Sequence, residues 1–161
     1  MAKVSAGLLM YRLRGGRVEV LLVHPGGPIW AKKDAGAWSI PKGEVSPGDD
    51  EFSTAQREFE EETGIPPQGD FVPLGTITLK SGKAVRAWAF EGDCDPASIK
   101  SNTFVMEWPP RSGKKQEYPE VDRAEFFAIE EAKRRINPAQ VALLAALEQI
   151  LSRRHPQTSG Q

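Results

Sequence analysis

The sequence holds a single cysteine, Cys94, and no long apolar run. One cysteine cannot form a disulfide within the chain, and so low a cysteine content is typical of the reducing cytoplasm. Residues 1–11 have no long apolar core, so they do not resemble a signal peptide. No stretch reaches the roughly 20 apolar residues that a transmembrane helix needs. We therefore expect a cytoplasmic protein with no membrane partner.

The sequence also lacks an excess of charge of either sign. Its formal net charge is -1 and its estimated pI is 6.2. Such a balance predicts no bulk electrostatic attraction for nucleic acid or for an anionic membrane. We see no internal repeat and no signal of an oligomeric state.

The length and apolar content predict one domain with a substantial core. The chain has 161 residues, of which 39% are hydrophobic. We expect this domain over residues 1–152 and a flexible C-terminal tail over 153–161. Periodicity predicts strands at 3–12, 17–24, 37–41, 71–80, 84–91, 102–108 and 120–129, and helices at about 50–63, 130–136 and 138–153. Alternating strands and helices of this kind predict an α/β sandwich.

Residues 43–65 are the most informative stretch. The helix within it should begin near Asp49 or Asp50, which can cap free backbone N–H groups, and should end at Gly64. An apolar stripe on this helix should face the core, and it consists of Phe52, Ala55 and Phe59.

Three glutamates crowd a neighbouring face of the same helix. Glu58, Glu61 and Glu62 stand at i, i+3 and i+4, where like charges repel, and only Arg57 lies close enough in sequence to offset them. A Glu-rich helix face is often simply solvated. The functional alternative is a divalent cation, since oxygen ligands suit Mg²⁺ or Mn²⁺.

The spacing around these glutamates favours the cation. Gly43 is followed by five residues, Asp49, seven residues, and then the run from Arg57 to Ile65, REFEEETGI. This arrangement resembles the Nudix box: Gly, five residues, Glu, seven residues, then Arg-Glu-apolar-any-Glu-Glu-any-Gly-apolar. Asp49 is the one departure, because the box has glutamate there.

The resemblance implies a fold and a chemistry for residues 4–151, although only the box itself is specific. The fold would be a mixed sheet between helices, with the metal-binding helix against it. The reaction would be attack of water on phosphorus in a phosphoanhydride of a nucleoside diphosphate derivative, with Mg²⁺ as cofactor and Mn²⁺ as an alternative. Matched residue by residue, the metal ligands would be Gly43 through its carbonyl, Glu58, Glu61 and Glu62.

The resemblance also suggests catalytic residues. Arg57 matches the arginine that orients a metal-binding glutamate, and Glu61 belongs to the catalytic set. Because Asp49 is shorter by one methylene, its task is either weakened or passed to a neighbour, Asp50 or Glu51. The general base would be Glu120, which precedes the strand at 120–129 as in the dinucleoside polyphosphate branch. The alternative is that Glu120 is a surface acid.

The substrate is less sharply defined. The lead-in from Trp38 to Gly43, WSIPKG, resembles that of dinucleoside polyphosphate and diphosphoinositol polyphosphate hydrolases. The usual tyrosine marker for the first activity is missing, since Gly82 stands at its position. We therefore expect a nucleoside polyphosphate or dinucleoside polyphosphate.

Four residues are candidates for binding that substrate. Trp30 and Lys32 lie in a Gly/Pro-rich loop that is either plain surface or substrate-facing, with the indole stacking on a base and the lysine meeting phosphate. Lys42 would meet a phosphate oxygen or be exposed. Arg86 would line a pocket beside core residues of its strand.

Together these features predict a metal-dependent pyrophosphohydrolase with a small-molecule nucleotide substrate. Two alternatives stay open: a Nudix-fold nucleotide-binding or regulatory module with reduced catalysis, and an RNA 5′-end pyrophosphohydrolase. An intact set of Arg57 and the three glutamates speaks against the first, and the lack of a basic stripe speaks against the second.

Overall fold

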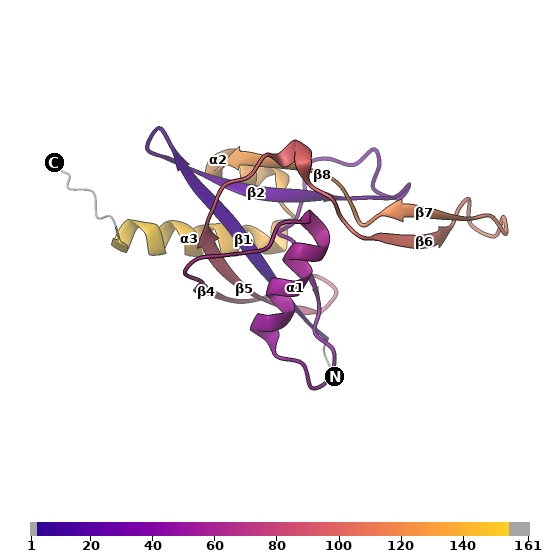
Figure 1. Ribbon diagram of the computed structural model, residues 1–161, viewed down its shortest axis with the longest axis horizontal. Coiled ribbons are helices and arrows are strands. Elements are labelled where there is room, and N and C mark those ends of the chain that lie inside the picture. The colour runs from indigo at the N-terminus through magenta and orange to yellow at the C-terminus, as the bar shows by residue number, and fades with distance from the viewer. Residues whose placement is uncertain (1–2, 155–161) are drawn as a thin grey trace.

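A twisted mixed sheet forms the centre of the molecule (Figure 1). The structure is a computed structural model and describes residues 3–154. The strands follow the spatial order β4-β5-β1-β2-β8, and only β1 and β5 run parallel. Their bounds are β1 (Val4–Arg14), β2 (Arg17–Pro25), β4 (Val72–Thr78), β5 (Ala84–Glu91) and β8 (Val121–Ala128), and the short β3 (Lys42–Glu44) pairs with β1.

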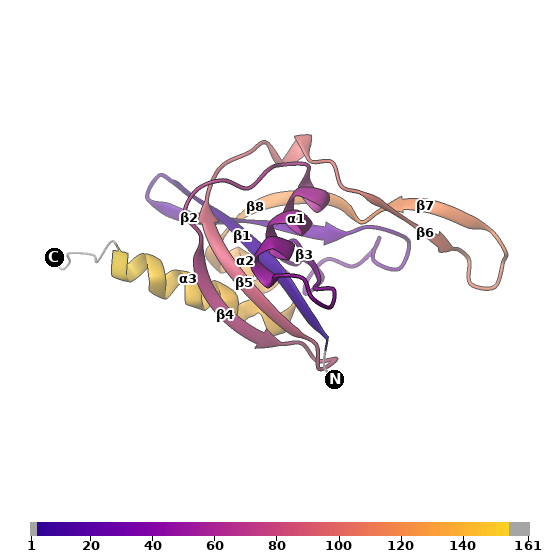
Figure 2. The same ribbon diagram turned by 60° about the horizontal axis from the view of Figure 1, so that its bottom comes forward.

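Helices cover both faces of this sheet (Figure 2). One face carries α1 (Glu51–Thr63), and the other carries α2 (Ile129–Arg135), the short 3-10 helix η2 (Pro138–Gln140) and α3 (Val141–Arg154). Alternation along the strands explains this, because successive side chains point to opposite faces. Leu8 and Leu21 pack in the same cluster as Ala55 and Phe59 of α1. The neighbouring Leu9, Val20 and Leu22 pack in the cluster that contains α3. The predicted α/β sandwich is confirmed.

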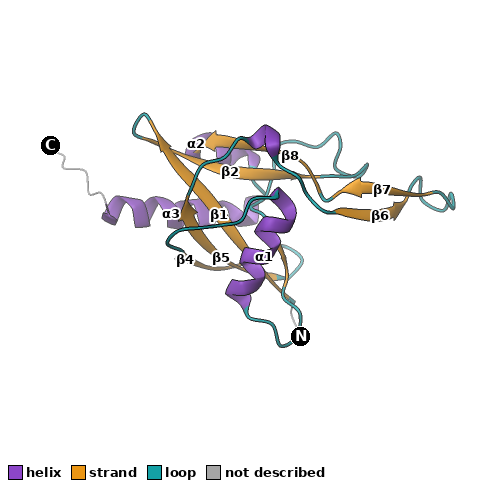
Figure 3. Ribbon diagram, in the orientation of Figure 1, coloured by secondary structure: helices purple, strands orange, loops and turns teal. Residues whose placement is uncertain are grey.

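A second, two-stranded sheet projects from the domain (Figure 3). It consists of β6 (Thr103–Glu107) and β7 (Lys115–Pro119), which pair antiparallel after the 3-10 helix η1 (Pro96–Ser98). The sequence predicted β6 but assigned 109–119 to a loop. The second half of that segment is β7, whose exposed polar residues gave no strand pattern.

The structure differs from the predicted elements at two further points. Residues 37–41 form isolated bridges, Trp38 to Ile136 and Ser39 to Val23, and the paired strand begins one residue later, at Lys42. Helix α3 continues to Arg154, so the expected tail begins inside its last turn, and 155–161 lie outside the described residues. None of the helices within 3–154 combines the length and apolar character needed to cross a bilayer.

A close approach of two paired segments fixes the position of β3. At Gly7 of β1, a β-carbon would lie 2.6 Å from the carbonyl oxygen of Pro41 and 2.8 Å from Cβ of Lys42. No other residue leaves room for the chain to pass there. Paired in this way, Lys42 and Gly43 lie beside the C-terminal half of α1.

Candidate metal and substrate site

Helix α1 forms where the sequence predicts it, with caps at both ends. Asp50 accepts a hydrogen bond from the backbone N–H of Ser53 at 2.9 Å, and Gly64 ends the helix in the left-handed conformation at φ 77°. Ala55 and Phe59 are fully buried against the sheet. Packing of this stripe fixes the rotation of the helix, so it also fixes the direction of the glutamates.

Gly43 and Glu58 are in close contact. A β-carbon at position 43 would overlap the carboxyl group of Glu58, so only glycine allows the strand and the helix to approach this closely. The backbone of Gly43 is held by pairing with Ala6 of β1. The structure therefore brings together two of the residues predicted as metal ligands.

Arg57 is surrounded by acids. Its guanidinium lies 3.4 Å from Glu58, 3.6 Å from Glu61 and 3.9 Å from Asp49. The Arg57 side chain is 48% exposed, so solvent screens these pairs. Their geometry nevertheless fits an arginine that orients a glutamate, and Asp49 acts as a further counter-ion.

The acids that face one another repel. Burial, reinforced by the negative charge of Glu58, raises the pKa of Glu62 to about 8. Burial and then the charge of Glu61 raise the pKa of Glu58, and the same two causes raise the pKa of Glu120. Burial lowers the pKa of Lys42, against the attraction of Glu62. This end of the molecule thus gathers negative charge with one lysine among it.

Two adjoining cavities lie at this end. The smaller, about 160 Å³, is lined by Lys42 of β3, Glu62 of α1 and Glu120, which lies between β7 and β8. The larger, about 530 Å³, is lined by Trp30 and again by Glu120. Glu120 thus lies at the boundary of both, and the fold unites residues that are far apart in sequence.

Two predicted substrate-binding residues lie away from these cavities. Arg86 on β5 pairs with Glu51, at the first turn of α1, at 3.2 Å, and it donates to the Thr76 hydroxyl at 3.3 Å. Lys32 is exposed on the loop of residues 26–36. Their substrate contacts stay predictions.

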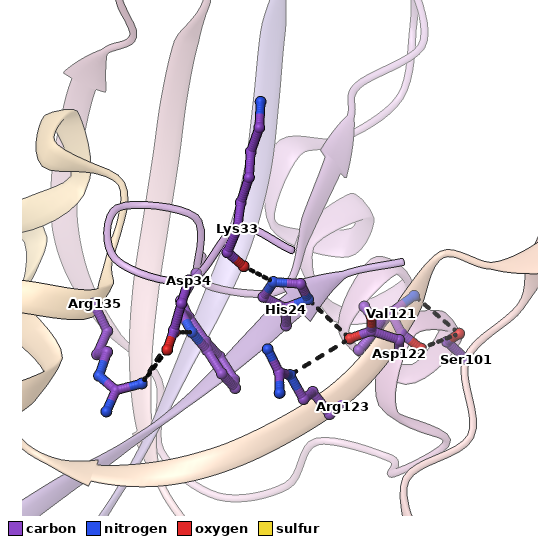
Figure 4. A network of polar contacts seen from close by, with 9 residues as sticks. His24, Lys33, Asp34, Ser101, Val121, Asp122, Arg123 and Arg135 are labelled. Atoms are coloured by element: carbon purple, nitrogen blue, oxygen red, sulfur yellow. Dashed lines mark hydrogen bonds and ion pairs between the residues drawn. The ribbon is translucent and has the colours of Figure 1, made fainter. Parts of the chain in front are cut away.

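The sequence did not single out His24, which is the buried centre of a polar network (Figure 4). His24 has no exposed surface; its Nδ1 lies 2.9 Å from Asp122 and its Nε2 lies 2.6 Å from the carbonyl oxygen of Lys33. The network joins the loop 26–36 to β8. Its signal was a histidine directly after the apolar run Val20 to Val23.

The predicted ligands suit a divalent cation in their chemistry. They are hard oxygen donors whose mutual repulsion a cation would relieve. Because Gly43 has no side chain, its backbone can lie against the carboxyl group of Glu58. Within residues 3–154, no three His, Cys, Asp or Glu side chains converge as a complete metal cage. Mg²⁺ does not need one, since it usually keeps several waters and shares its coordination with substrate phosphates.

Comparison with known proteins agrees with this geometry. The NUDIX domain pattern matches residues 1–147, and the chain belongs to the NUDIX domain family. Members of this family generally use divalent metal ions.

Two curated relatives match shorter segments. The asymmetrical bis(5′-nucleosyl)-tetraphosphatase of Caenorhabditis elegans is 40% identical over 65 residues, which cover 40% of this chain and 43% of that protein. The RNA pyrophosphohydrolase of Erythrobacter litoralis (strain HTCC2594) is 39% identical over 62 residues, 35% of this chain and 36% of that protein. The matches thus span less than half of the length of either relative.

Solved structures share the fold over nearly the whole chain. The C. elegans Ap4A hydrolase in a binary complex has a TM-score of 0.67 at 23% identity, covering 92% of this chain and 98% of that one. The NUDIX domain of Shewanella oneidensis NrtR complexed with ADP ribose has a TM-score of 0.66 at 12% identity. The match covers 94% of this chain and 89% of that one. Identities this low support the shared fold alone.

Proposed function

We propose that this protein is a metal-dependent pyrophosphohydrolase that cleaves a phosphoanhydride bond in a nucleoside polyphosphate or dinucleoside polyphosphate. The observation that carries the proposal is the meeting of Glu62, Lys42 and Glu120 around one cavity, beside the contact of Glu58 with Gly43. The asymmetrical tetraphosphatase of C. elegans supports the substrate class, and so does family membership.

The cation would be held by Glu58, Glu61, Glu62 and the carbonyl of Gly43. Mg²⁺ is the first choice and Mn²⁺ the second, since both prefer oxygen ligands. When bound, it would neutralise charge on the phosphoryl oxygens and help to lower the pKa of a water. Arg57 keeps Glu58 and Glu61 oriented before the substrate arrives.

The remaining polar residues have separate roles in the proposed reaction. Glu120 accepts a proton from the attacking water as the P–O bond of the anhydride breaks, and its raised pKa suits a base that works near neutral pH. Lys42 offers a positive charge to a phosphate oxygen. Trp30 faces the neighbouring cavity, where a base would lie, and Lys32 and Arg86 are proposed to meet outer phosphates.

A second candidate is hydrolysis at the 5′ end of RNA. The match to the RNA pyrophosphohydrolase of E. litoralis favours it. Cleavage of mononucleotides together with inertness toward a 5′-triphosphorylated RNA would eliminate it. We also propose a cytoplasmic location, supported by the free thiol of Cys94.

The direct test is a panel of nucleotides, dinucleoside polyphosphates, ADP-ribose and diphosphoinositol polyphosphates, assayed with Mg²⁺ and with Mn²⁺, with products identified by mass. We expect Glu61→Gln and Glu62→Gln each to lower hydrolysis by several orders of magnitude while the fold is retained. Glu60→Gln is the matched control, because Glu60 lies exposed on the same helix. Full activity in both site variants would overturn the metal assignment.

A further inference from the structure

The projecting β6–β7 hairpin forms one wall of the larger cavity, and the loop 26–36 forms the other. Beyond Pro25, Gly26 and Glu120, the cavity lining consists of Gly27, Ile29, Trp30, Phe104, Val105 and Met106. The two walls touch, since a β-carbon at Gly27 would lie 3.0 Å from Cζ of Phe104. The cavity is therefore a groove between the hairpin and the loop.

The loop wall is anchored at both of its ends. The backbone N–H of Gly26 donates to the carbonyl of Glu120 at 2.9 Å, and the carbonyl of Lys33 accepts from buried His24 at 2.6 Å. Between these anchors, the N–H of Lys33 donates to the carbonyl of Trp30 at 3.0 Å. Trp30 is thus held on a tight turn and is 38% exposed.

The hairpin wall is tied to the glutamate helix. The backbone N–H of Asn102, just before β6, donates to the carbonyl of Glu61 at 2.8 Å. The backbone N–H of Glu120 donates to the carbonyl of Asn102 at 2.9 Å. Phe104 and Tyr118 stack across the hairpin with ring centroids 6.1 Å apart. The same backbone bonds therefore position the groove and the acidic cavity relative to each other.

We propose that this groove binds the nucleobase of the substrate, between Trp30 and the Phe104 and Met106 face of the hairpin; the assignment rests on the proposed function. The volume of about 530 Å³ falls within the range of about 300–1,000 Å³ that is usual for small-molecule sites. The groove opens at Glu120 onto the cavity proposed for phosphate. Lys33 places its ammonium 5.0 Å from the Trp30 ring centroid, so the loop also carries a positive charge next to this wall of the groove.

The lining predicts tolerance toward the identity of the base. Among the side chains that line the groove within the described residues, only Glu120 and the indole N–H of Trp30 can form a strong hydrogen bond. Stacking and apolar contact are available to every base, and an apolar pocket discriminates weakly between similar ligands. The β6–β7 hairpin therefore supplies affinity for a base without selecting which one.

Binding without hydrolysis separates this inference from the proposed catalysis. We would titrate the full-length protein by calorimetry with the methylene-bridged analogues of ATP and UTP and with methylenediphosphonate, which has no base. We expect the two nucleotides to bind within about tenfold of each other and methylenediphosphonate at least about tenfold more weakly. A larger preference between the nucleotides, or equal binding of methylenediphosphonate, would overturn the proposal.

Variants then locate the site. Trp30→Ala and Phe104→Ala should each weaken nucleotide binding about tenfold and leave methylenediphosphonate binding unchanged. Trp30 lies on an exposed loop, so its variant tests the groove even if Phe104→Ala fails to fold. Leu13→Ala is the control, because Leu13 is a similarly exposed apolar residue, 46% exposed, at the β1–β2 turn. Unchanged nucleotide binding in Trp30→Ala would refute the assignment, whereas retained hydrolysis in Glu61→Gln and Glu62→Gln would refute only the proposed catalysis.

Discussion

Asp49 is one methylene shorter than the glutamate of the Nudix box, and the structure gives it a specific neighbour. Its carboxylate lies 3.9 Å from the guanidinium of Arg57, which also contacts Glu58 and Glu61. We expect Asp49→Ala to lower kcat/KM about 10-fold to 100-fold, because loss of an outer partner loosens the arginine that orients the ligands. Asp49→Glu should keep full activity. The measurement is kcat/KM over a Mg²⁺ titration, and full activity in Asp49→Ala would show that Asp49 is dispensable.

Glu120 has the position and the environment of a general base. It lines both cavities, and burial together with the charge of Glu61 raises its pKa. We expect Glu120→Gln to lower kcat by about 10²-fold to 10⁴-fold with little change in KM, since the amide cannot accept the proton. Steady-state kinetics checks this, with Glu117→Gln on the neighbouring strand as control. A kcat near that of the native protein would assign Glu120 to the surface instead.

At the level of elements, His24 links three parts of the fold. From the end of β2 it contacts the carbonyl of Lys33 in the loop 26–36 and the carboxylate of Asp122 in β8 (Figure 4). Its ring also packs edge-on against the Trp38 ring, with the two ring centroids 5.3 Å apart. We expect His24→Leu to lower the free energy of unfolding by about 1–3 kcal/mol, because it leaves polar partners without their hydrogen bonds. Urea denaturation measures this change.

The same variant has a second readout. His24→Leu should also raise KM for the nucleotide substrate, since the loop that carries Trp30 loses its anchor. Asp122→Asn serves as the comparison: its amide can still form a hydrogen bond with Nδ1 of His24, so it should cost less. Unchanged stability in His24→Leu would mean that the network contributes nothing to the fold.

The sequence predicted the elements whose signals are local. Helix α1 has a capping aspartate, a glycine at its end and an apolar stripe, and all three were visible before the structure. Helix α3 has no comparable signal for its rotation: Leu143 and Leu147 are buried, whereas the apolar Ala145 is exposed. A helix with apolar residues on most sides has no sharp stripe, so tertiary packing decides its rotation.

The parts of the site that the sequence did not predict depend on contacts between distant segments. Strand β7 forms only because β6 pairs with it, and its Lys, Gln and Glu residues lack strand character. The groove beside Trp30 therefore could not be predicted, although Phe104 and Met106 alternate along their strand. Similarly, no feature of the sequence around Arg86 indicates that its side chain forms an ion pair with Glu51.

For the molecule as a whole, the site occupies one end of the sandwich. The segment 40–43 runs alongside β1, the C-terminal half of α1 lies beside it, and the chain enters β8 after Glu120. Helix α1 and the residue just before β8 thus bring carboxylates into a shared region, beside Lys42. Such an arrangement is unfavourable without a cation, so stability and function should oppose each other here.

This opposition predicts how the stability of the metal-free protein depends on pH. The pKa of Glu62 is about 8 in the folded state against 4.5 for an unperturbed glutamate, because of burial and then the charge of Glu58. Between these values the folded state holds a proton that the unfolded state has lost, so stability falls as pH rises. The pKa values of Glu58 and Glu120 are raised as well, which acts in the same direction.

We expect the free energy of unfolding in EDTA to fall by at least about 1 kcal/mol from pH 5 to pH 8. This is a lower bound, because a shift of a single pKa unit in Glu62 would already account for about 1.4 kcal/mol. Mg²⁺ should restore stability increasingly toward pH 8, because it binds the folded state with its carboxylates ionised. Glu62→Gln should flatten the decline and abolish much of the Mg²⁺ effect, whereas Glu60→Gln should do neither. Urea denaturation at pH 5, 6, 7 and 8, with EDTA or Mg²⁺, measures all of this. Identical profiles for the native protein and Glu62→Gln would show that this carboxylate neither carries the buried charge nor binds the cation.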